Sequence, residues 1–476
     1  RYELMFKEET IDQKLKNMRE SSFSELALNV MSEFIGEKEI PRQDLKKLIE
    51  RTYATNKSFR DPKITPVVSL DSTTQPKIME LFHGPTYAFK DVALQFLGNL
   101  FEYFLERDSK SNSITILGAT SGDTGSASIA GLLGKKGVTT FILFPEGKVS
   151  PIQERQMTTL AANDESVHCL SVQGTFDDAQ AIVKDLFVDK DFQADFQLGA
   201  VNSINFARIL AQIVYYFSAY YQVTKSNDEV VNFVVPTGNF GDILAGFYAK
   251  LMGLPIGKLV VATNSNDILH RFFESGKYHR EDCKPTISPS MDICISSNFE
   301  RFLLWVADDD TDKVMKWMSG VKQNGKLTLD QSGDLLKKAR SVMGSANASE
   351  QEILTCIRET EDKYGYILCP HSAIGLVAYR KLADSVLANG TTVCLATAHH
   401  AKFPDAVRKA VGPDVKVPIE PALEKLKTLP QEKHIIPATS KAVKSKMYSI
   451  VTKPDDASPR HSKTRTTNKK KLMKRK

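Results

Sequence analysis

The chain has 476 residues, of which 42% are hydrophobic and 25% are charged, as is ordinary for globular proteins. This length suffices for two or three domains with large cores. No apolar run approaches the roughly 18–20 residues that a membrane-spanning helix needs, which argues against an integral membrane protein.

The cysteines and histidines argue against disulfides and against a metal site. The six cysteines are scattered without a CxxC pair, and the nine histidines form no HExxH motif. Scattered thiols in a long chain are typical of a reducing compartment, so we expect a cytoplasmic protein without a bound metal. His399 and His400 are adjacent, and neighbours in sequence rarely share a metal ion, so we interpret both as loop residues.

The first 75 residues are predicted to form a helical cap region. Apolar residues recur with helical spacing in two segments, 21–34 and 41–53. Amphipathic helices bury one face, so we expect these two to lie against the catalytic body.

The stretch Glu-Leu-Phe-His-Gly-Pro-Thr-Tyr-Ala-Phe-Lys, residues 80–90, carries the first candidate catalytic residue. Lys90 follows a Gly-Pro turn and precedes apolar residues at helical spacing, which predicts an amphipathic helix that opens near Ala88. A cation in the first turn opposes the helix dipole, and this eases the loss of its proton. A lysine that forms a Schiff base or acts as a base needs that loss. The alternative is a solvated surface lysine.

Residues 113–127 predict a loop that binds an anionic group. A short strand at 114–117 runs into a loop rich in Gly, Ser, Thr and Asp and then into a helix, and a strand at 138–144 completes a βαβ unit. The hydroxyl groups of Thr120, Ser121 and Thr124 and the N–H groups of residues 122–125 suit a carboxylate or phosphate of a substrate.

Residues 230–246 predict a phosphate-binding loop. A β-branched strand at 230–235 ends in Pro-Thr-Gly-Asn-Phe-Gly, and a helix follows at 242–251. Several N–H groups then point at one spot with the helix dipole behind them. Gly238 and Gly241 allow a tight turn and close approach of a phosphate. No Lys-Ser/Thr pair follows, so a small phosphorylated cofactor fits better than ATP. The alternative is an ordinary strand-to-helix turn.

These segments predict an α/β protein with two open, twisted α/β units and a cofactor in the cleft between them. Open parallel sheets bind ligands at the carboxyl ends of their strands, which supports this placement. We expect a cap at 1–75, one unit at 76–205, a second unit at 206–435 with a helical insertion at about 300–361, and a divergent tail at 436–476.

The tail accounts for the basic balance of the chain. Ten Lys or Arg and two Asp between residues 453 and 476 contribute +8 to the net charge of +6, so the rest of the chain carries −2. The tail is polar and almost without apolar residues, which predicts disorder. Nuclear targeting or nucleic-acid contact is one interpretation. We favour a solvated extension, and therefore expect no nucleic-acid partner.

Three motifs in this order resemble the threonine synthase family, pyridoxal-phosphate enzymes of the tryptophan-synthase-β fold type. They are Phe-Lys-Asp at 89–91, Ala-Thr-Ser-Gly-Asp-Thr-Gly at 119–125 and Gly-Asn-Phe-Gly-Asp at 238–242. The sequence around Lys90 is similar to that of the fungal and bacterial branch of the family. The resemblance extends from about residue 21 to about residue 429. Beyond about Ile435 the final helix expected for the family is replaced by Pro437, scattered lysines and the basic tail.

The resemblance implies that Lys90 forms the Schiff base with pyridoxal 5'-phosphate. It places a run of five residues around the phosphate and ring of the cofactor: Gly238, Asn239, Phe240, Gly241 and Asp242. Thr397, in the loop after a strand at 391–396, would face the pyridine nitrogen. A hydroxyl group there would not hold a full positive charge on the ring.

The substrate residues implied by the resemblance have structural alternatives. Arg208 is a candidate for the substrate phosphate or carboxylate, since a guanidinium can grip either with two bonds, but a structural ion pair would also explain it. Asn205 precedes an apolar helix and is equally explained as a helix cap. The further candidates are Thr86, Ser121, Asp123 and Thr124.

The resemblance implies a lyase that converts O-phospho-L-homoserine and water to L-threonine and phosphate, the last step of threonine biosynthesis. One alternative is a threonine-synthase-like phospho-lyase that releases a 2-oxo acid, although the sequence at 240–242 matches the synthases and favours synthesis. A second is an inactive homologue with a nucleic-acid-binding tail, but the presence of Lys90, both glycine loops and Thr397 argues against it. We expect a small-molecule substrate, no membrane partner, and a monomer or homodimer.

Overall fold

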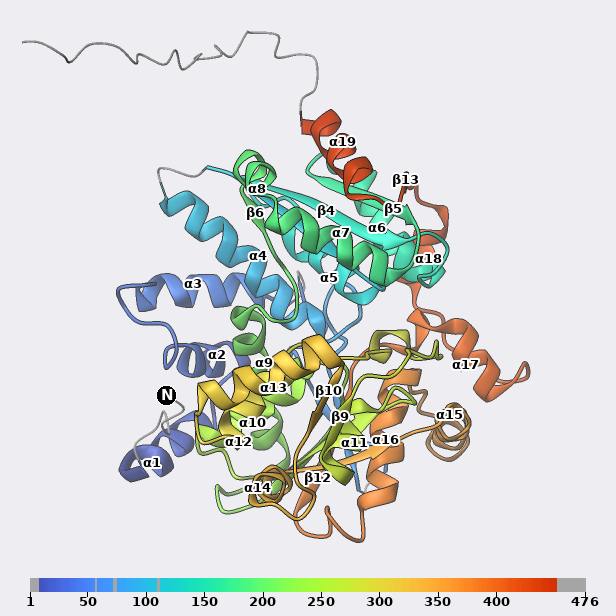
Figure 1. Cartoon of the computed structure of the whole chain (residues 1–476). Coiled ribbons are helices and arrows are strands. Elements are labelled where there is room, and N and C mark those ends of the chain that lie inside the picture. The colour runs from blue at the N-terminus through green and yellow to red at the C-terminus, as the bar shows by residue number, and fades with distance from the viewer. Residues whose placement is uncertain (1–7, 56–57, 72–74, 109–111, 452–476) are drawn as a thin grey trace, which may run out of the picture.

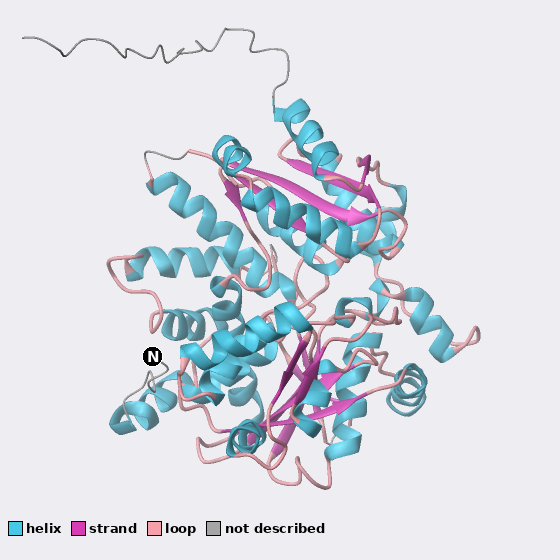
Figure 2. Cartoon of the chain, viewed as in Figure 1, coloured by secondary structure: helices cyan, strands magenta, loops and turns pink. Residues whose placement is uncertain are grey.

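The computed structural model describes residues 8–55, 58–71, 75–108 and 112–451. Most of its strands belong to two sheets that lie apart in the molecule, each surrounded by helices (Figure 2). The predicted α/β class with two open units is therefore confirmed. None of the helices in the described part of the chain combines the length and the hydrophobicity that a membrane-spanning helix requires.

The smaller sheet has the order β13-β5-β4-β3-β6, and all its strand pairs are parallel. Its strands are β3 (Ile114–Ala119), β4 (Val138–Pro145), β5 (Val167–Gln173), β6 (Leu198–Gly199) and β13 (His434–Pro437). Parallel neighbours need a crossover connection, and α5 (Asp123–Leu132) supplies it between β3 and β4. The βαβ unit predicted for this segment is present.

Helices cover both faces of the smaller sheet (Figure 1). Phe141 and Leu143 of β4 pack with α7, α8 and α19, whereas Ile142 and Phe144 of the same strand pack with α5 and α6. This follows from the strand geometry, because successive side chains point to opposite faces. The remaining helices here are α4 (Lys90–Arg107), α6 (Pro151–Ala161), α7 (Phe176–Val188), α8 (Lys190–Phe196) and α19 (Ser440–Val451).

The larger sheet has the order β1-β2-β12-β7-β8-β11, and its pairs are parallel except for β1 with β2. Its strands are β1 (Val67–Ser69), β2 (Lys77–Glu80), β7 (Val231–Pro236), β8 (Ile256–Thr263), β11 (Met343–Asn347) and β12 (Thr391–Ala396). The central strand β7 is buried along its whole length, as expected for a parallel sheet with two covered faces.

Two sets of helices cover the larger sheet. Phe233 of β7 packs with α9 (Phe206–Val223) and α10 (Gly241–Leu251), and the adjacent Val234 packs on the other face with α16 (Pro370–Leu382). Further helices on that second face are α15 (Glu350–Tyr364) and α17 (Pro404–Val411).

The cap region is helical, as predicted. Its helices are α1 (Glu8–Met18), α2 (Phe23–Met31) and α3 (Arg42–Thr52), and the last two match the predicted segments. Ser22 and Glu25 form a capping box that fixes the start of α2. The apolar faces of α2 and α3 join the cluster that contains α9, which places them beside the larger sheet.

The other elements lie outside the two large sheets. They are α11 (Ile268–Ser275), β9 (Lys277–His279), η1 (Pro289–Met291), α12 (Phe299–Val306), α13 (Thr311–Asn324), β10 (Lys326–Thr328), α14 (Asp334–Val342), η2 (His400–Lys402), α18 (Pro421–Lys425) and η3 (Leu426–Thr428). β9 and β10 form an antiparallel pair of their own.

Two predicted boundaries are wrong. β1 and β2 belong to the larger sheet, so the chain enters that sheet before it builds the smaller one, and the division at residues 75 and 76 cuts β1 from its partner. The segment 300–361 is not purely helical, because β11 lies within it and forms an edge of the larger sheet. The strand sequence Met-Gly-Ser-Ala-Asn contains no β-branched residue, and it is a strand only through its pairing with β8.

The predicted disorder of 436–476 is wrong for residues 436–451, whereas residues 452–476 lie outside the described residues. β13 pairs with β5, and α19 buries Val443 and Met447 completely against the smaller sheet's core. An ion pair between Lys444 and Asp189 joins α19 to the start of α8. The two buried residues stand four positions apart, a signal too short to identify a helix whose stability comes from tertiary packing.

We predict that Met447→Ala lowers the free energy of unfolding by about 2–5 kcal/mol, because it removes a fully buried side chain and leaves a cavity. Urea unfolding followed by circular dichroism measures the change. Ser445→Ala on the exposed side of α19 is the control, with an expected change within about 0.5 kcal/mol. Equal effects of the two substitutions would contradict the packing of α19.

Candidate active site

Backbone pairing fixes Lys90 at the junction of the two sheets. The N–H of Phe89 donates to the carbonyl oxygen of Thr397 (2.8 Å), and the N–H of His399 donates to that of Tyr87 (3.1 Å). The segment after β2 is thereby held against the segment after β12, both at the carboxyl ends of their strands. Helix α4 then begins at Lys90, two residues later than predicted, and leads into the smaller unit.

The Lys90 side chain is 11% exposed, and its Nζ lies 3.5 Å from Oδ2 of Asp123. Burial lowers the pKa of Lys90, and the positive charges of Lys402 and Arg208 act in the same direction, whereas Asp123 opposes them. The lowered pKa agrees with the sequence argument. Burial is the largest cause, however, and it could not be judged from the position in the helix.

The buried carboxylate of Asp123 contacts donor groups from four parts of the chain. Besides Lys90, its Oδ1 lies 2.6 Å from Nζ of Lys402 and accepts from Nε2 of Gln153 (2.8 Å), and its Oδ2 accepts from Oγ of Ser290 (3.3 Å). Burial alone would raise the pKa of Asp123, but Lys402 and Lys90 hold it well below its usual range. Asp123 is therefore ionised at neutral pH.

In the loop that carries Asp123, a side chain of the same loop accepts hydrogen bonds from some of the backbone N–H groups. Oγ1 of Thr120 accepts from the N–H groups of Gly122 (2.9 Å) and Gly125 (2.8 Å), so two of the four N–H groups predicted to bind an anion are engaged within the loop. Gly122 has φ 137°, and a Cβ there would lie 2.3 Å from Oε1 of Gln153, which explains why this position is a glycine. Ser121 and Thr124 are half-buried.

The loop 238–242 follows β7 and starts α10, as predicted, but its strained residue is not a glycine. Phe240 has φ 65°, whereas Gly238 and Gly241 do not have positive φ values. The Phe240 side chain is buried against Phe299, with ring centroids 5.2 Å apart, and this packing holds the turn. The carbonyl oxygen of Gly238 accepts from Oγ of Ser296 (2.8 Å).

A side chain at Gly241, at the start of α10, would be in ordinary van der Waals contact with the protein. A Cβ on Gly241 would meet Nδ2 of Asn298 at 3.5 Å and nothing closer, whereas one on Gly238 would lie 3.1 Å from Ile293. The reason for a glycine at 241 is therefore not a clash within the described protein. Asn239 lies between the two glycines, and its side chain accepts from Oγ of Ser297 (3.0 Å).

Asp242 is buried at the first turn of α10. Its Oδ1 accepts from the hydroxyl groups of Tyr215 (2.5 Å) and Tyr216 (2.8 Å), and its Oδ2 has no hydrogen-bond partner among the described residues. Burial raises the pKa of Asp242 to about 6, against the two tyrosine hydrogen bonds and the charge of Lys90, which lower it.

Arg208 is a buried guanidinium without a carboxylate partner among the described residues. It is 3% exposed, Nη1 donates to the carbonyl oxygen of Val201 (2.8 Å), and Nε has no hydrogen-bond partner in the described part of the chain. Burial lowers the pKa of Arg208 to about 10. The alternative of a structural ion pair is not supported. A buried charge without a counter-ion is costly, which suggests that an anionic ligand completes this position.

The other predicted residues are placed as follows. Asn205 caps α9, since its Oδ1 accepts from the N–H of Ala207 (3.1 Å), so the structural alternative holds for this residue. The hydroxyl of Thr86 donates to Asp91 (2.6 Å) and is therefore used within the loop before Lys90. Thr397 follows β12, is 6% exposed, and its N–H donates to Oγ of Ser372 (3.0 Å).

His371 belongs to the same cluster, although no sequence pattern identified it. It lies at the start of α16, is buried, and its Nε2 accepts from the N–H of Ser290 (3.3 Å). Burial lowers the pKa of His371 to about 4, so the imidazole is neutral at pH 7.

The adjacent His399 and His400 stack with centroids 4.2 Å apart. Among the described residues, no group of three or more His, Cys, Asp or Glu side chains could hold a metal ion.

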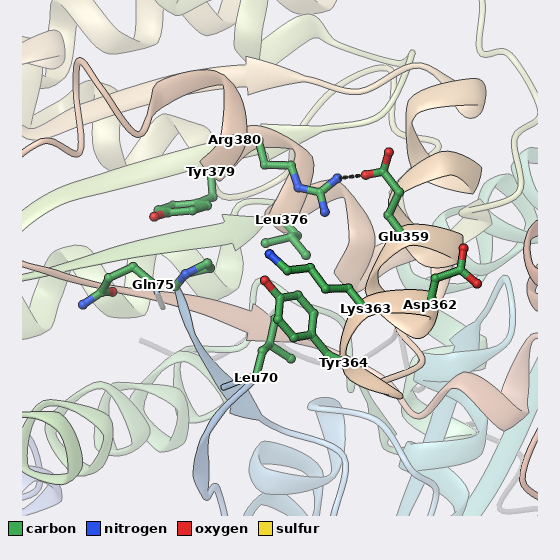
Figure 3. A pocket seen from close by; sticks show the side chains of 10 residues that line it. Leu70, Gln75, Glu359, Asp362, Lys363, Tyr364, Leu376, Tyr379 and Arg380 are labelled. Carbon is green, nitrogen blue, oxygen red and sulfur yellow. Dashed lines mark hydrogen bonds and ion pairs between the residues drawn. The ribbon is translucent and has the colours of Figure 1, made fainter. Parts of the chain in front are cut away.

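A cavity of about 620 Å³ lies away from this cluster (Figure 3). Its walls come from the segment before β2, the end of α15 and the second half of α16, and Arg380 forms an ion pair with Glu359 beside it (2.7 Å). The cavity adjoins the start of β2, whereas Lys90 follows the end of that strand. In open α/β sheets the carboxyl ends bind the ligand, so this cavity is not the cofactor position.

Family models match nearly the whole described chain. A model of the pyridoxal-phosphate dependent enzymes matches residues 63–398, and models of the threonine synthase N terminus and of the threonine synthase C-terminal region match residues 8–53 and 372–447. The C-terminal match includes β13 and the first eight residues of α19, where the sequence was expected to depart from the family.

Similar proteins agree with these matches. Threonine synthase of Saccharomyces cerevisiae is 50% identical over 82% of this chain and 79% of its own length, and that of Schizosaccharomyces pombe is 47% identical over 83% and 80%. The crystal structure of pyridoxal-phosphate-bound threonine synthase from Brucella melitensis superposes with a TM-score of 0.85, at 42% identity, over 93% of this chain and 91% of that one.

The fold and the buried lysine between two sheets, together with these matches, define a pyridoxal-phosphate-dependent enzyme. Within that class the chain belongs to the threonine synthase family, which is a family of lyases.

The residues present fit the cofactor. Lys90 offers a buried amine with a lowered pKa, and α10 starts at Gly241, where N–H groups and the helix dipole favour a phosphate. The buried Oδ2 of Asp242 and Nε of Arg208, which have no partners among the described residues, mark polar positions that a ligand would complete.

We predict that Gly241→Ala weakens cofactor binding at least about tenfold, because a methyl group at the start of α10 would hinder the close approach of a phosphate to the backbone N–H groups there. The stability of the cofactor-free protein should change little, since the new Cβ meets no protein atom closer than 3.5 Å. Equilibrium dialysis and thermal unfolding of the cofactor-free protein measure the two quantities. Unchanged cofactor affinity would place the phosphate elsewhere.

Proposed function

We propose that Lys90 binds pyridoxal phosphate covalently and that the loop 238–242 and Thr397 surround it. The position of Lys90 supports this, because the Phe89–Thr397 hydrogen bond brings it close to the end of β12, and Asp242 and Lys90 are near enough to influence each other's charge. Thr397 offers a hydroxyl group rather than a carboxylate, and such a partner does not hold a full positive charge on the pyridine nitrogen.

The proposed substrate is O-phospho-L-homoserine, and the observation that carries this assignment is the buried Arg208, which has no counter-ion among the described residues. A phosphate dianion would supply its missing counter-ion and accept from Nε, in the two-bonded manner that a guanidinium favours. Ser121 and Thr124 are half-buried in the loop beside Asp123 and offer further hydroxyl donors. Asn205 and Thr86 are satisfied within the protein and support the site by holding α9 and the loop before Lys90.

Each side chain then has a defined task. The cofactor, when bound, stabilises negative charge on substrate carbon atoms next to the amino group. Lys90 moves protons at its Nζ, for which its lowered pKa suits it. Arg208 holds the phosphate as it leaves, and water adds at the β-carbon to give threonine. Asp123 keeps the Lys90 amine in place by a contact of 3.5 Å.

The phospho-lyase alternative uses the same residues up to the loss of phosphate and releases a 2-oxo acid instead. The relatives named threonine synthase, at 47% and 50% identity, favour synthesis. An inactive homologue is disfavoured by the intact cluster around Lys90. The cytoplasmic location and the monomeric or homodimeric state stay predictions.

We predict that the purified protein converts O-phospho-L-homoserine to equal amounts of phosphate and L-threonine. Phosphate release and amino-acid analysis measure the two products. Arg208→Met should lower kcat/KM by about 30- to 150-fold, because truncation of one donor to a charged group costs roughly 2–3 kcal/mol. Release of 2-oxobutanoate and ammonia in place of threonine would establish the phospho-lyase, and the absence of phosphate release would contradict both reactions.

A further inference from the structure

Lys402 is the most completely buried charge of the cluster, and the proposed reaction gives it no task. Its side chain is 0% exposed, and it lies in η2, five residues after Thr397. Its Nζ lies 2.6 Å from Oδ1 of Asp123, which is its ion-pair partner within the described residues. The pair joins a loop of the larger unit to the first residue of α5 in the smaller unit.

We propose that Lys402 is a positioning residue that holds the Asp123 carboxylate and so prevents it from closing into a tight ion pair with Lys90. The inference rests on the proposed role of Lys90 as the cofactor lysine. In this arrangement Asp123 orients the Lys90 amine without fixing its proton, and the amine can be free when it must act as a nucleophile.

The geometry of the carboxylate supports this division. Lys402 and Gln153 occupy Oδ1 at 2.6 and 2.8 Å, whereas Ser290 and Lys90 approach Oδ2 at the longer distances of 3.3 and 3.5 Å. The contact with Lys402 is the shorter of the two, but it is an ion pair without hydrogen-bond geometry, because Nζ of Lys402 has no hydrogen-bond partner among the described residues. The contact with Lys90 is a long hydrogen bond of 3.5 Å. The Asp123 carboxylate therefore lies closer to the lysine that the proposed reaction does not use.

The remaining charges around Lys90 do not replace this effect. Arg208 on α9 is a second cation, and His371 on α16 is buried and neutral at pH 7. Asp242 on α10 is the other carboxylate whose charge interacts with Lys90, but its Oδ1 is engaged by two tyrosine hydroxyl groups. Among these groups, Asp123 alone has an ion-pair contact with Lys90.

Two substitutions should therefore shift the titration of Lys90 in opposite directions. Lys402→Met removes the competing cation, so Asp123 closes on Lys90 and the protonated amine is stabilised to higher pH. Asp123→Asn removes the anion while Lys402 and Arg208 remain, so the amine loses its proton at lower pH. The opposite signs follow from the opposite charges of the two residues, because Lys402 lowers the pKa of Lys90 and Asp123 raises it.

The test measures the reactivity of the Lys90 amine against pH in the full-length protein from which the cofactor has been removed. Acetic anhydride at trace concentration labels free amines, and mass spectrometry quantifies the peptide that contains Lys90. We expect the midpoint to rise by about one pH unit in Lys402→Met and to fall by about one unit in Asp123→Asn. Lys433→Met, which breaks an ion pair of 2.5 Å with Glu154 instead, is the matched control and should leave the midpoint unchanged.

Shifts of the same sign, or no shift in either variant, would overturn the proposal. If Lys402→Met does not fold, the downward shift in Asp123→Asn is still required, and its absence overturns the proposal alone. The labelling reports on Lys90 whether or not this lysine holds the cofactor. Failure of the proposed cofactor role is seen separately, as normal absorbance of bound cofactor near ~410–420 nm in a Lys90→Ala protein.

Discussion

The backbone pairing between residues 87–89 and 397–399 is the constraint on which the site depends. Two hydrogen bonds, from Phe89 to Thr397 and from His399 to Tyr87, tie together the segments that leave β2 and β12. Because these strands are parallel neighbours, their carboxyl ends lie side by side, and the chain leaves this edge directly into α4. Lys90 is therefore placed by the larger sheet and carried by a helix of the smaller unit.

The charges around Lys90 are arranged for chemistry at some cost in stability. The buried carboxylate of Asp123 contacts Lys402, Gln153 and Ser290. These contacts connect the two units at this carboxylate. Arg208 receives no comparable compensation within the described residues, and burial lowers its pKa. A buried charge without a counter-ion destabilises the ligand-free protein. A ligand that supplies the counter-ion removes this cost, and this contributes to the free energy of binding.

Local sequence signals predicted the parts of the site that are made by consecutive residues. Strand, loop and helix followed from apolar spacing and glycines at 114–133 and 230–251, and Lys90 followed from its place at a helix start. Lys402 and Ser290 could not be predicted, because each meets Asp123 from more than 160 residues away. The strand β11 and the helix α19 were missed for a related reason, since both depend on tertiary packing rather than on their own composition.

We propose that this junction makes Lys90 the residue that holds the cofactor. Borohydride reduction of the cofactor-loaded protein fixes the cofactor on its lysine, and peptide mapping by mass spectrometry identifies the site. We expect a single modified peptide that contains Lys90. Modification of Lys402 or any other lysine, with Lys90 unlabelled, would contradict it.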